Sequence, residues 1–518
     1  MTVDSSINKT ASNSASEPVS LKKDRKLKLM GRNFFPFSAL WFSIVALEIS
    51  LLAGKFIDQS DIWWHLRNAR ELLTSHAFLR ADSYTYTAAG TPLQNHEWLS
   101  EVAYYLAFRA WGLHGPLAVE VVVLWLTFAT VYYLALRRGA NCSDAGLVTI
   151  AGVALGSYSF APRMHQFGWL CLAGLLLVLE RFQRTGKGLW MLPPLFALWA
   201  NLHGSWAYGL VVIGVFIASG LLQGQWGKVA AERWTPAELK KLLAASTLSV
   251  AALFINPYGY RLVWYPFEVY TWYGRGGLLD NVAEWKSVDF HQPWGKLTMF
   301  MLLGLLAAAW FSPRPWKLRD ILLSLFAVWA SLVHLRFLLF AAIILIPILG
   351  PRLRLLSPYH ANKDKPWLNL VMTVFIAGLM LWMFPSTAQL QESIDGWFPR
   401  DALPFMQRKQ MSGRLFNLAE FGGYIEWNTP ELKTFVDGRA DVFVNNGIFD
   451  DYMKINAIEN PFELLDKYKI EYVLFPVNRR LSYVLDRSER WRTIYGDNVV
   501  KLYERAPATV TSLKADRK

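Results

Sequence analysis

Long apolar stretches separated by short polar connections fill the chain between residues 34 and 384. A helix needs about 20 mainly apolar residues to cross the hydrocarbon core of a bilayer. With this length as the criterion, the sequence predicts about eleven transmembrane helices, at 36–57, 116–136, 144–161, 166–181, 189–202, 205–223, 242–256, 295–311, 319–334, 336–350 and 367–384. The pattern therefore indicates a polytopic α-helical membrane protein.

Two connections between the predicted spans are long enough to fold outside the membrane. The first, 58–115, contains a predicted surface helix at 62–73, an extended segment with a turn at 80–92, and an amphipathic helix at 98–111. The second, 257–293, is rich in tyrosine, tryptophan and glycine. Both a cover over a site and a solvated connector would have this composition.

Beyond residue 384 the pattern changes to that of a soluble α/β domain. Short apolar runs predict strands, and longer periodic runs predict helices. The strands are expected at 414–418, 434–437, 472–475 and 499–503, and the helices at 445–457, 461–468 and 479–492. Strands that alternate with helices favour a small parallel or mixed sheet with helices packed against it. The sequence therefore predicts a small C-terminal α/β domain at 385–518.

Composition agrees with a membrane protein. Of the 518 residues, 53% are hydrophobic and 18% are charged, whereas a soluble domain of average composition has about 25% charged residues. The 24 tryptophans suit a protein with long membrane–water boundaries, where the indole ring is both apolar and a hydrogen-bond donor. Only two cysteines, Cys142 and Cys171, are present, which argues against a disulfide framework.

The net charge of +13 is distributed as membrane topology requires, so no nucleic-acid partner is expected. Basic residues cluster before the first apolar stretch and in the connections at 137–138, 181–187, 314–319 and 352–365, which alternation of spans places on one side. Cytoplasmic connections of membrane proteins are enriched in lysine and arginine. This distribution predicts a cytoplasmic N-terminus, with a disordered basic arm at 1–33, and an extracytoplasmic C-terminal domain.

The first outer connection begins with a group of ionisable residues. Asp58, Asp61 and His65 have spacings of three and four, so they share one face if the first membrane helix continues through them. A partly desolvated carboxylate at this level could act as a general base. Alternatively, Asp58 and Asp61 could hold a divalent cation such as Mg²⁺ or Mn²⁺. A helix that simply ends at the interface would also carry such residues.

Further polar residues, which are energetically unfavourable near hydrocarbon, lie at the same outer ends of the predicted spans. His96 and Glu97 resemble the start of a zinc helix, but position 100 is Ser100, so the HExxH signature is absent, which argues against a zincin. Glu97 could serve the chemistry or stabilise a helix N-terminus. Arg163 with His165 could bind phosphate oxygens or reach toward lipid headgroups.

The later outer turns add four more candidate residues. Arg336, next to a histidine, offers the same choice between phosphate and headgroups as Arg163. Asn201 and His203 form a tight outer turn whose side chains could bind sugar hydroxyls or cap helices. Glu284, followed by a tryptophan, could bind a sugar ring or anchor the loop at the membrane surface. Ionisable groups this close to hydrocarbon usually mark a site.

Five motifs carry a resemblance to a known family. The sequences DQSDIWWHL (58–66), DSYTYT (82–87) and NHEWL (95–99) resemble the first outer loop of GT-C-type membrane glycosyltransferases. They are similar above all to bacterial multi-pass proteins that pair this loop with a C-terminal soluble domain, and FGGY (421–424) and VDGRAD (436–441) resemble the signatures of that domain. The resemblance implies a GT-C-like transmembrane domain at 34–384 in a bacterial inner membrane.

The family resemblance also implies a chemistry. In GT-C enzymes an acidic residue of the first outer loop is catalytic, and the donor is typically a sugar linked to polyprenyl phosphate. By this resemblance, Asp61 is the candidate for the catalytic acidic residue, and Asp58 is the second acidic position. The hypothesis is an inverting transfer of one sugar to an extracytoplasmic acceptor (a lipid, glycan or protein), with Asp58 or Glu97 assisting.

The substrate-binding residues of this hypothesis are the other polar residues of the outer connections. They would be His65, His96, Arg163, His165, Asn201, His203, Glu284 and Arg336. A transporter or flippase for lipid-linked saccharides, a glycan ligase or polymerase, and a scaffold with a decayed site remain as alternatives. A transporter would place its polar groups at mid-membrane depth.

Overall fold

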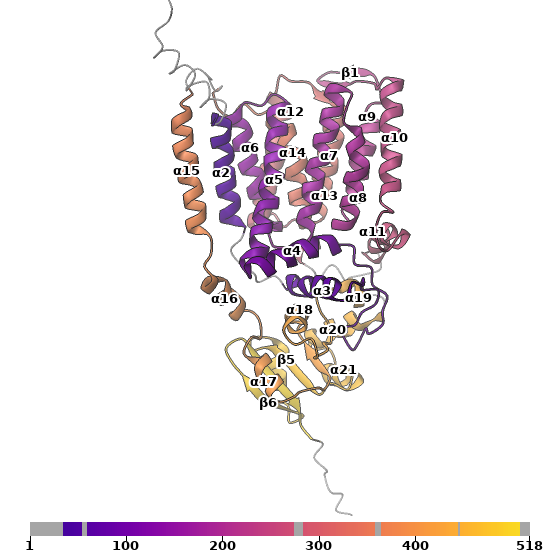
Figure 1. Ribbon diagram of the computed structural model, residues 1–518, viewed down its shortest axis with the longest axis vertical. Helices are drawn as coiled ribbons and strands as arrows, with labels where there is room; N and C mark the ends of the chain where they lie inside the picture. Colours follow the sequence, from indigo (N-terminus) through magenta and orange to yellow (C-terminus); the bar gives the residue numbers. More distant parts are fainter. Residues whose placement is uncertain (1–34, 54–59, 274–282, 358–363, 444–445, 508–518) are drawn as a thin grey trace, which may run out of the picture.

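The computed structural model describes residues 35–53, 60–273, 283–357, 364–443 and 446–507. Helices occupy each of the eleven apolar stretches and run side by side as a bundle (Figure 1). They are α2 (Phe37–Leu52), α5 (His114–Arg137), α6 (Cys142–Gly156), α7 (His165–Thr185), α8 (Leu192–Leu202), α9 (Trp206–Ser219), α10 (Pro236–Ala252), α12 (Pro293–Phe311), α13 (Leu318–Val333), α14 (Leu338–Leu349) and α15 (Pro366–Met383).

Three of these helices, α5, α12 and α15, are long and apolar enough to cross a membrane by length and composition, and several others are shorter and apolar. Large apolar side chains on the outside of the bundle are uncovered. Trp382 of α15 is 81% exposed and Trp310 of α12 is 79% exposed. Such surfaces require an apolar solvent. In contrast, all twelve residues of α14 are buried, which is the expected position of a helix that is apolar all round.

Short elements join the helices of the bundle. They are the 3₁₀ turns η1 (Ser157–Ser159), η2 (Leu189–Met191), η4 (Ala283–Trp285) and η5 (Leu335–Phe337), helix α11 (Tyr260–Tyr273), and strands β1 (Gly224–Trp226), β2 (Val229–Ala231) and β3 (Trp316–Lys317). Strands β1 to β3 form a small sheet in the order β1-β2-β3. This sheet lies at the end of the bundle opposite to α3 and the C-terminal part (Figure 1).

The first outer connection forms two helices, α3 (Asp61–Ser75) and α4 (Trp98–Trp111), which lie across one end of the bundle (Figure 1). Helix α2 ends at Leu52 and α3 begins separately at Asp61, so the first membrane helix does not continue through Asp61 and His65, and α3 covers the surface helix predicted at 62–73. The polar composition of α3 explains the break, since its buried Arg67 and Asn68 could not be accommodated in hydrocarbon. Asp58 lies outside the described residues.

The C-terminal part contains a four-stranded mixed sheet in the order β4-β5-β7-β6. Strands β4 (Leu415–Asn417) and β5 (Tyr472–Pro476) are parallel, whereas β7 (Val500–Arg505) is antiparallel to both β5 and β6 (Trp491–Gly496). The helices are α16 (Thr387–Asp395), α17 (Ala402–Arg408), α18 (Ala419–Asn428), α19 (Ala440–Phe443), α20 (Ile448–Ala457), α21 (Pro461–Lys467) and α22 (Arg480–Leu485).

Two predictions for this part are wrong. The segment 434–437 is not a strand of the sheet; instead Thr434 forms an isolated parallel bridge with Thr85 of the first outer connection. The predicted helix at 479–492 ends at Leu485, and strand β6 begins at Trp491. The first error arises because Thr434 pairs with a distant segment, and the second because residues 491–496 pair with β7 in a hairpin; in both cases strand pairing overrides the local pattern.

A single hydrophobic cluster joins α3 to the C-terminal part. Trp63 packs edge-on against Phe398 and Tyr424, with ring centroids 6.0 and 5.1 Å apart. Ile62 and Leu66 belong to the same buried cluster, which also contains residues of β4, β5 and β7. Helix α3 is therefore held between the bundle and the C-terminal sheet.

Candidate active site

A cavity of about 1510 Å³ lies where the end of the bundle, the first outer connection and the C-terminal part meet. Its wall includes eight residues that the sequence singled out: Asp61, His96, Glu97, Arg163, His165, His203, Glu284 and Arg336. They come from α3, the segment before α4, the connections around α7 and α8, η4 and η5. The structure therefore brings these side chains together, while their roles stay predictions.

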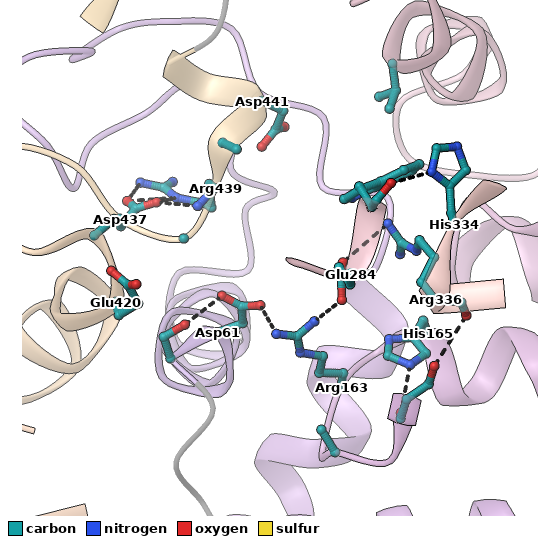
Figure 2. Close-up of a pocket in the computed structure, with 18 of the residues that line it drawn as sticks. Asp61, Arg163, His165, Glu284, His334, Arg336, Glu420, Asp437, Arg439 and Asp441 are labelled. Atoms are coloured by element: carbon teal, nitrogen blue, oxygen red, sulfur yellow. Dashed lines mark hydrogen bonds and ion pairs between the residues drawn. The ribbon is translucent and has the colours of Figure 1, made fainter. Parts of the chain in front are cut away.

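A chain of alternating charges runs along one wall of the cavity (Figure 2). Nη2 of Arg163 lies 3.4 Å from Oδ2 of Asp61, and Nη1 donates to Oε2 of Glu284 at 2.6 Å. The other oxygen of Glu284 lies 3.5 Å from Nη1 of Arg336. Burial alone would raise the pKa of Glu284, but the guanidinium groups of Arg336 and Arg163 lower it to about 2. Glu284 is therefore ionised and orients both arginines.

Arg336 is held by further contacts with η4. Its guanidinium lies 4.3 Å from the ring of Trp285, within the range of a cation–π interaction. Nδ1 of His334 donates to the carbonyl oxygen of Trp285 at 2.6 Å. These contacts fix η4 against η5, so that Glu284 and Arg336 face the cavity from two connections of the bundle (Figure 2).

Glu97 lies among histidines on another part of the wall. Its carboxylate lies 3.2 Å from Nε2 of His203, 3.6 Å from Nε2 of His96 and 3.7 Å from Nε2 of His65. Burial raises the pKa of Glu97 to about 7, and burial also lowers the pKa of each of these three histidines. A carboxyl group with this pKa can take up or release a proton near neutral pH.

Three of these residues are close enough to one another to hold a metal ion, because ligand atoms of His96, Glu97 and His203 lie within 4.8 Å of one another. A neutral imidazole has one nitrogen with a free lone pair. In His203 this nitrogen is Nδ1, which accepts the backbone N–H of Ser205 at 3.0 Å. Its Nε2 therefore carries the proton that faces Glu97. A cation could bind here only if His203 released Ser205, so the arrangement does not fit a metal as it stands.

Two predicted site residues lie behind the wall. Nδ1 of His65 forms a 2.7 Å hydrogen bond with Glu101, so His65 connects Glu101 to Glu97. Asn201 donates to the carbonyl oxygen of Ile255 at 2.8 Å and accepts from Nε1 of Trp98 at 2.8 Å. The structure thus gives Asn201 a packing contact between connections, away from the cavity lining.

Glu101 is a buried residue that the sequence interpretation missed. Besides the bond to His65, it accepts hydrogen bonds from Asn68 at 3.0 Å and Asn95 at 2.5 Å. Burial raises its pKa to about 8. The signal in the sequence was its position four residues after Glu97, which places both carboxyl groups on one face of the start of α4.

The C-terminal part supplies the remaining wall, which the sequence interpretation also missed. It contributes Glu420, Asp437, Gly438, Arg439, Asp441, Asn478 and Arg479 among others. Glu420, Asp437, Arg439 and Asp441 face the cavity region opposite the chain of charges (Figure 2). The sequence interpretation recognised VDGRAD only as a family signature. In the structure, residues of this motif line the cavity.

Two solved structures share this fold. The oligosaccharyltransferase of Archaeoglobus fulgidus, in the apo form, superposes with a TM-score of 0.52 and 12% sequence identity, over 84% of this chain and 69% of that chain. The arabinofuranosyltransferase AftD from Mycobacteria gives a TM-score of 0.50 and 10% identity, over 91% of this chain and 41% of that chain. This chain thus spans less than half of the length of AftD.

Both structures are GT-C glycosyltransferases, so the resemblance seen in the sequence is confirmed at the level of the fold. No family model and no curated protein matches the chain.

Proposed function

We propose that this protein is a membrane glycosyltransferase that moves a sugar from a polyprenyl-phosphate donor to an extracytoplasmic acceptor. The observation that carries the proposal is the convergence of Asp61, Glu97, Arg163 and Arg336 on one large cavity at one end of an apolar helical bundle. The fold shared with an oligosaccharyltransferase and an arabinofuranosyltransferase supports this class of reaction.

The two arginines are the proposed phosphate ligands. A guanidinium has five N–H donors in a planar fork that matches phosphate oxygens. The ion pairs with Asp61 and Glu284 orient Arg163. The ion pair with Glu284 and the cation–π contact with Trp285 orient Arg336. Preorganised donors in a partly buried site stabilise negative charge as it grows on a leaving group. The arginines would thus stabilise the polyprenyl phosphate as it departs.

The carboxyl groups are the proposed proton acceptors. Asp61, assisted by Glu97, would take the proton of the acceptor hydroxyl while the hydroxyl oxygen bonds to the anomeric carbon. The bond between that carbon and the phosphate oxygen breaks, and both of its electrons leave with polyprenyl phosphate. Attack from the face opposite the phosphate inverts the anomeric centre. The raised pKa of Glu97, about 7, suits this role.

The cavity position also bears on the membrane arrangement. We infer about eleven transmembrane helices with a cytoplasmic N-terminus, and a C-terminal α/β domain at 385–518 on the extracytoplasmic side of a bacterial inner membrane. The helices at all eleven apolar stretches and the uncovered apolar faces of α12 and α15 support this inference. A cavity at the end of the bundle favours an enzyme over a transporter, whose site lies at mid-membrane depth.

The proposal predicts a chemical product. Purified protein in vesicles, supplied with radiolabelled polyprenyl-phosphate sugars and envelope extract as acceptor, should release free polyprenyl phosphate and a labelled glycoconjugate. A deletion strain should accumulate the lipid-linked donor or lose a glycan. Movement of the intact lipid-linked sugar across the vesicle, without cleavage of the glycosidic bond, would instead favour a transporter.

A further inference from the structure

We propose that the segment 437–441 is a positioning element of the active site: the bare backbone of Gly438 sets the position of the Asp61 carboxylate, and the ion pairs of Arg439 hold Gly438 in place. The inference rests on the proposed function, because it assigns a role in the reaction to residues outside the transmembrane region.

The first observation is the close approach of Gly438 to Asp61. A Cβ atom at Gly438 would overlap Oδ1 of Asp61 and lie 3.1 Å from Nε1 of Trp64. The φ angle of Gly438 is outside the left-handed region, so the backbone itself would tolerate a side chain. The requirement for glycine is therefore the space taken by Asp61 and not the backbone conformation. Any side chain here must push on the carboxylate.

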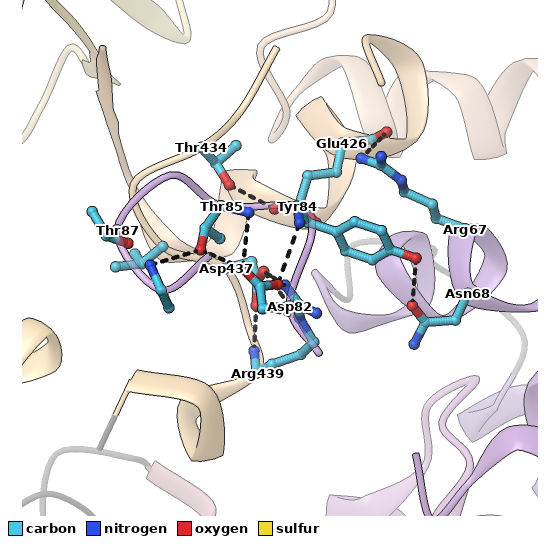
Figure 3. A network of polar contacts seen from close by, with 12 residues as sticks. Arg67, Asn68, Asp82, Tyr84, Thr85, Thr87, Glu426, Thr434, Asp437 and Arg439 are labelled. Atoms are coloured by element: carbon cyan, nitrogen blue, oxygen red, sulfur yellow. Dashed lines mark hydrogen bonds and ion pairs between the residues drawn. The ribbon is translucent and has the colours of Figure 1, made fainter. Parts of the chain in front are cut away.

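The second observation is the buried ion cluster of Arg439 (Figure 3). Its Nε donates to both oxygens of Asp437 at 3.0 Å, and its Nη2 donates to Oδ1 of Asp82 at 2.6 Å. All three side chains are at least 95% buried. The guanidinium also lies 4.7 Å from the ring of Tyr84. Buried ion pairs of this geometry tolerate little movement, because displaced partners would be left as uncompensated charges.

The third observation is the tie between this cluster and the first outer connection. Asp82 accepts hydrogen bonds from the backbone N–H of Thr85 at 3.1 Å and from its hydroxyl at 2.7 Å. Thr85 in turn pairs with Thr434, and the backbone N–H of Tyr86 donates to the carbonyl oxygen of Thr434 at 3.2 Å. The segments 82–87 and 434–437 therefore run together, and Gly438 follows directly.

The fourth observation is the contact of Asp441, at the C-terminal end of the segment 437–441. The hydroxyl of Tyr265 on α11 donates to Oδ2 of Asp441 at 3.0 Å, and the Tyr265 ring lies 4.6 Å from the His96 ring. Segment 437–441 thus contacts α3 through Gly438, the first outer connection through Arg439, and the second through Asp441. The contact through Gly438 meets the Asp61 carboxylate directly, and the other two hold the segment on either side of Gly438.

The consequence is that a side chain at Gly438 changes the distance between Asp61 and Arg163 without removing either group. A misplacement of about 1 Å can cost about 100-fold in rate. Because Arg336 and Glu284 would stay in place, donor binding should change little. A residue needed only for folding would instead lower the amount of active protein and leave kcat per folded molecule unchanged.

The first test is the Gly438→Ala variant, with Gly378→Ala of α15 as the matched control, since a Cβ there meets nothing within 4 Å. We expect the kcat of Gly438→Ala to fall by about 10- to 100-fold, with the donor KM changed by less than about twofold. Gly378→Ala should keep the wild-type kcat. In an Asp61→Asn background, Gly438→Ala should have no further effect. An unchanged kcat, or the same loss in both backgrounds, would overturn the proposal.

The second test does not depend on activity. The pair Asp61→Cys with Gly438→Cys should form a disulfide without added oxidant beyond air, since bridged Cβ atoms lie about 3.5–4.5 Å apart. Asp61→Cys alone is the control, because the native Cys142 and Cys171 are buried. Absence of the disulfide would overturn the inference. If the wild-type protein transferred no sugar, the proposed function would fail, and the disulfide alone would decide whether Gly438 holds Asp61.

Discussion

The carboxylate of Asp61 lies 3.4 Å from the guanidinium of Arg163, although one begins α3 and the other precedes α7. Glu284, on a third connection, binds the same guanidinium at 2.6 Å. The proposed proton acceptor and a proposed phosphate ligand are therefore in direct contact. An enzyme that breaks a sugar–phosphate bond needs both groups within reach of the same substrate.

Arg336 provides a test of phosphate binding. Arg336→Lys keeps the positive charge but loses the planar fork and the stacking on Trp285. We expect transfer to fall by about 100-fold, with most of the loss appearing in kcat because the charge on the leaving phosphate is greatest in the transition state. The control is Arg400→Lys, at an exposed ion pair with Asp395. Equal transfer rates for the two variants would show that Arg336 does not stabilise the leaving phosphate.

The raised pKa of Glu97, about 7, predicts the pH dependence of transfer. A base accepts a proton only when it is deprotonated, so kcat/KM should rise with pH through about 7 and level off above it. Glu97→Gln should remove this rise, whereas Glu463→Gln, at an exposed position of α21, should keep it. A rate profile that keeps the rise in Glu97→Gln would assign the titration to another group.

Glu101 predicts how stability depends on pH. Its pKa is raised by burial from 4.5 in the unfolded chain to about 8 in the folded protein. Between these values the folded state binds a proton that the unfolded state has released, so the free energy of unfolding decreases as pH rises from about 5 to about 8. Glu101→Gln should weaken this decrease. Thermal unfolding in detergent at both pH values measures it, and an identical pH slope in the variant would contradict the assignment.

Trp63 tests the attachment of α3 to the C-terminal part. Trp63→Ala removes the edge-on contacts with Phe398 and Tyr424 and leaves a cavity in their shared cluster. A loss of about 3–5 kcal/mol in the free energy of unfolding is expected. Trp382→Ala is the control, since Trp382 is 81% exposed on α15. Trypsin should also cleave the Trp63→Ala variant faster; similar cleavage of both variants would argue against a joint core.

The sequence was informative where a single local signal decides the structure. An apolar run of fixed length predicts a helix directly, so each of the eleven runs contains one. The convergence of Asp61, Arg163, Glu284 and Arg336 followed from their common level at the outer turns. Neither inference needed to know which helix packs against which.

Other features could not be predicted because they depend on which segments pair or pack together. The pairing of Thr85 with Thr434 replaced a predicted strand, and β6 replaced the end of a predicted helix. Nothing local to Gly438 indicates that its missing side chain leaves room for Asp61. The separate helix at 62–73 was predicted, but the spacing of Asp58, Asp61 and His65 also fits a helix that continues from the membrane, so the sequence left both arrangements open.

The central claim is that this cavity catalyses sugar transfer through Asp61. The most direct measurement compares purified wild-type protein with Asp61→Asn and with Asp289→Asn, a carboxylate on the exposed surface, in release of polyprenyl phosphate from a lipid-linked sugar. Loss of a general base costs about 100- to 10,000-fold. The account predicts this loss for Asp61→Asn and wild-type turnover for Asp289→Asn. Wild-type turnover by Asp61→Asn would contradict it.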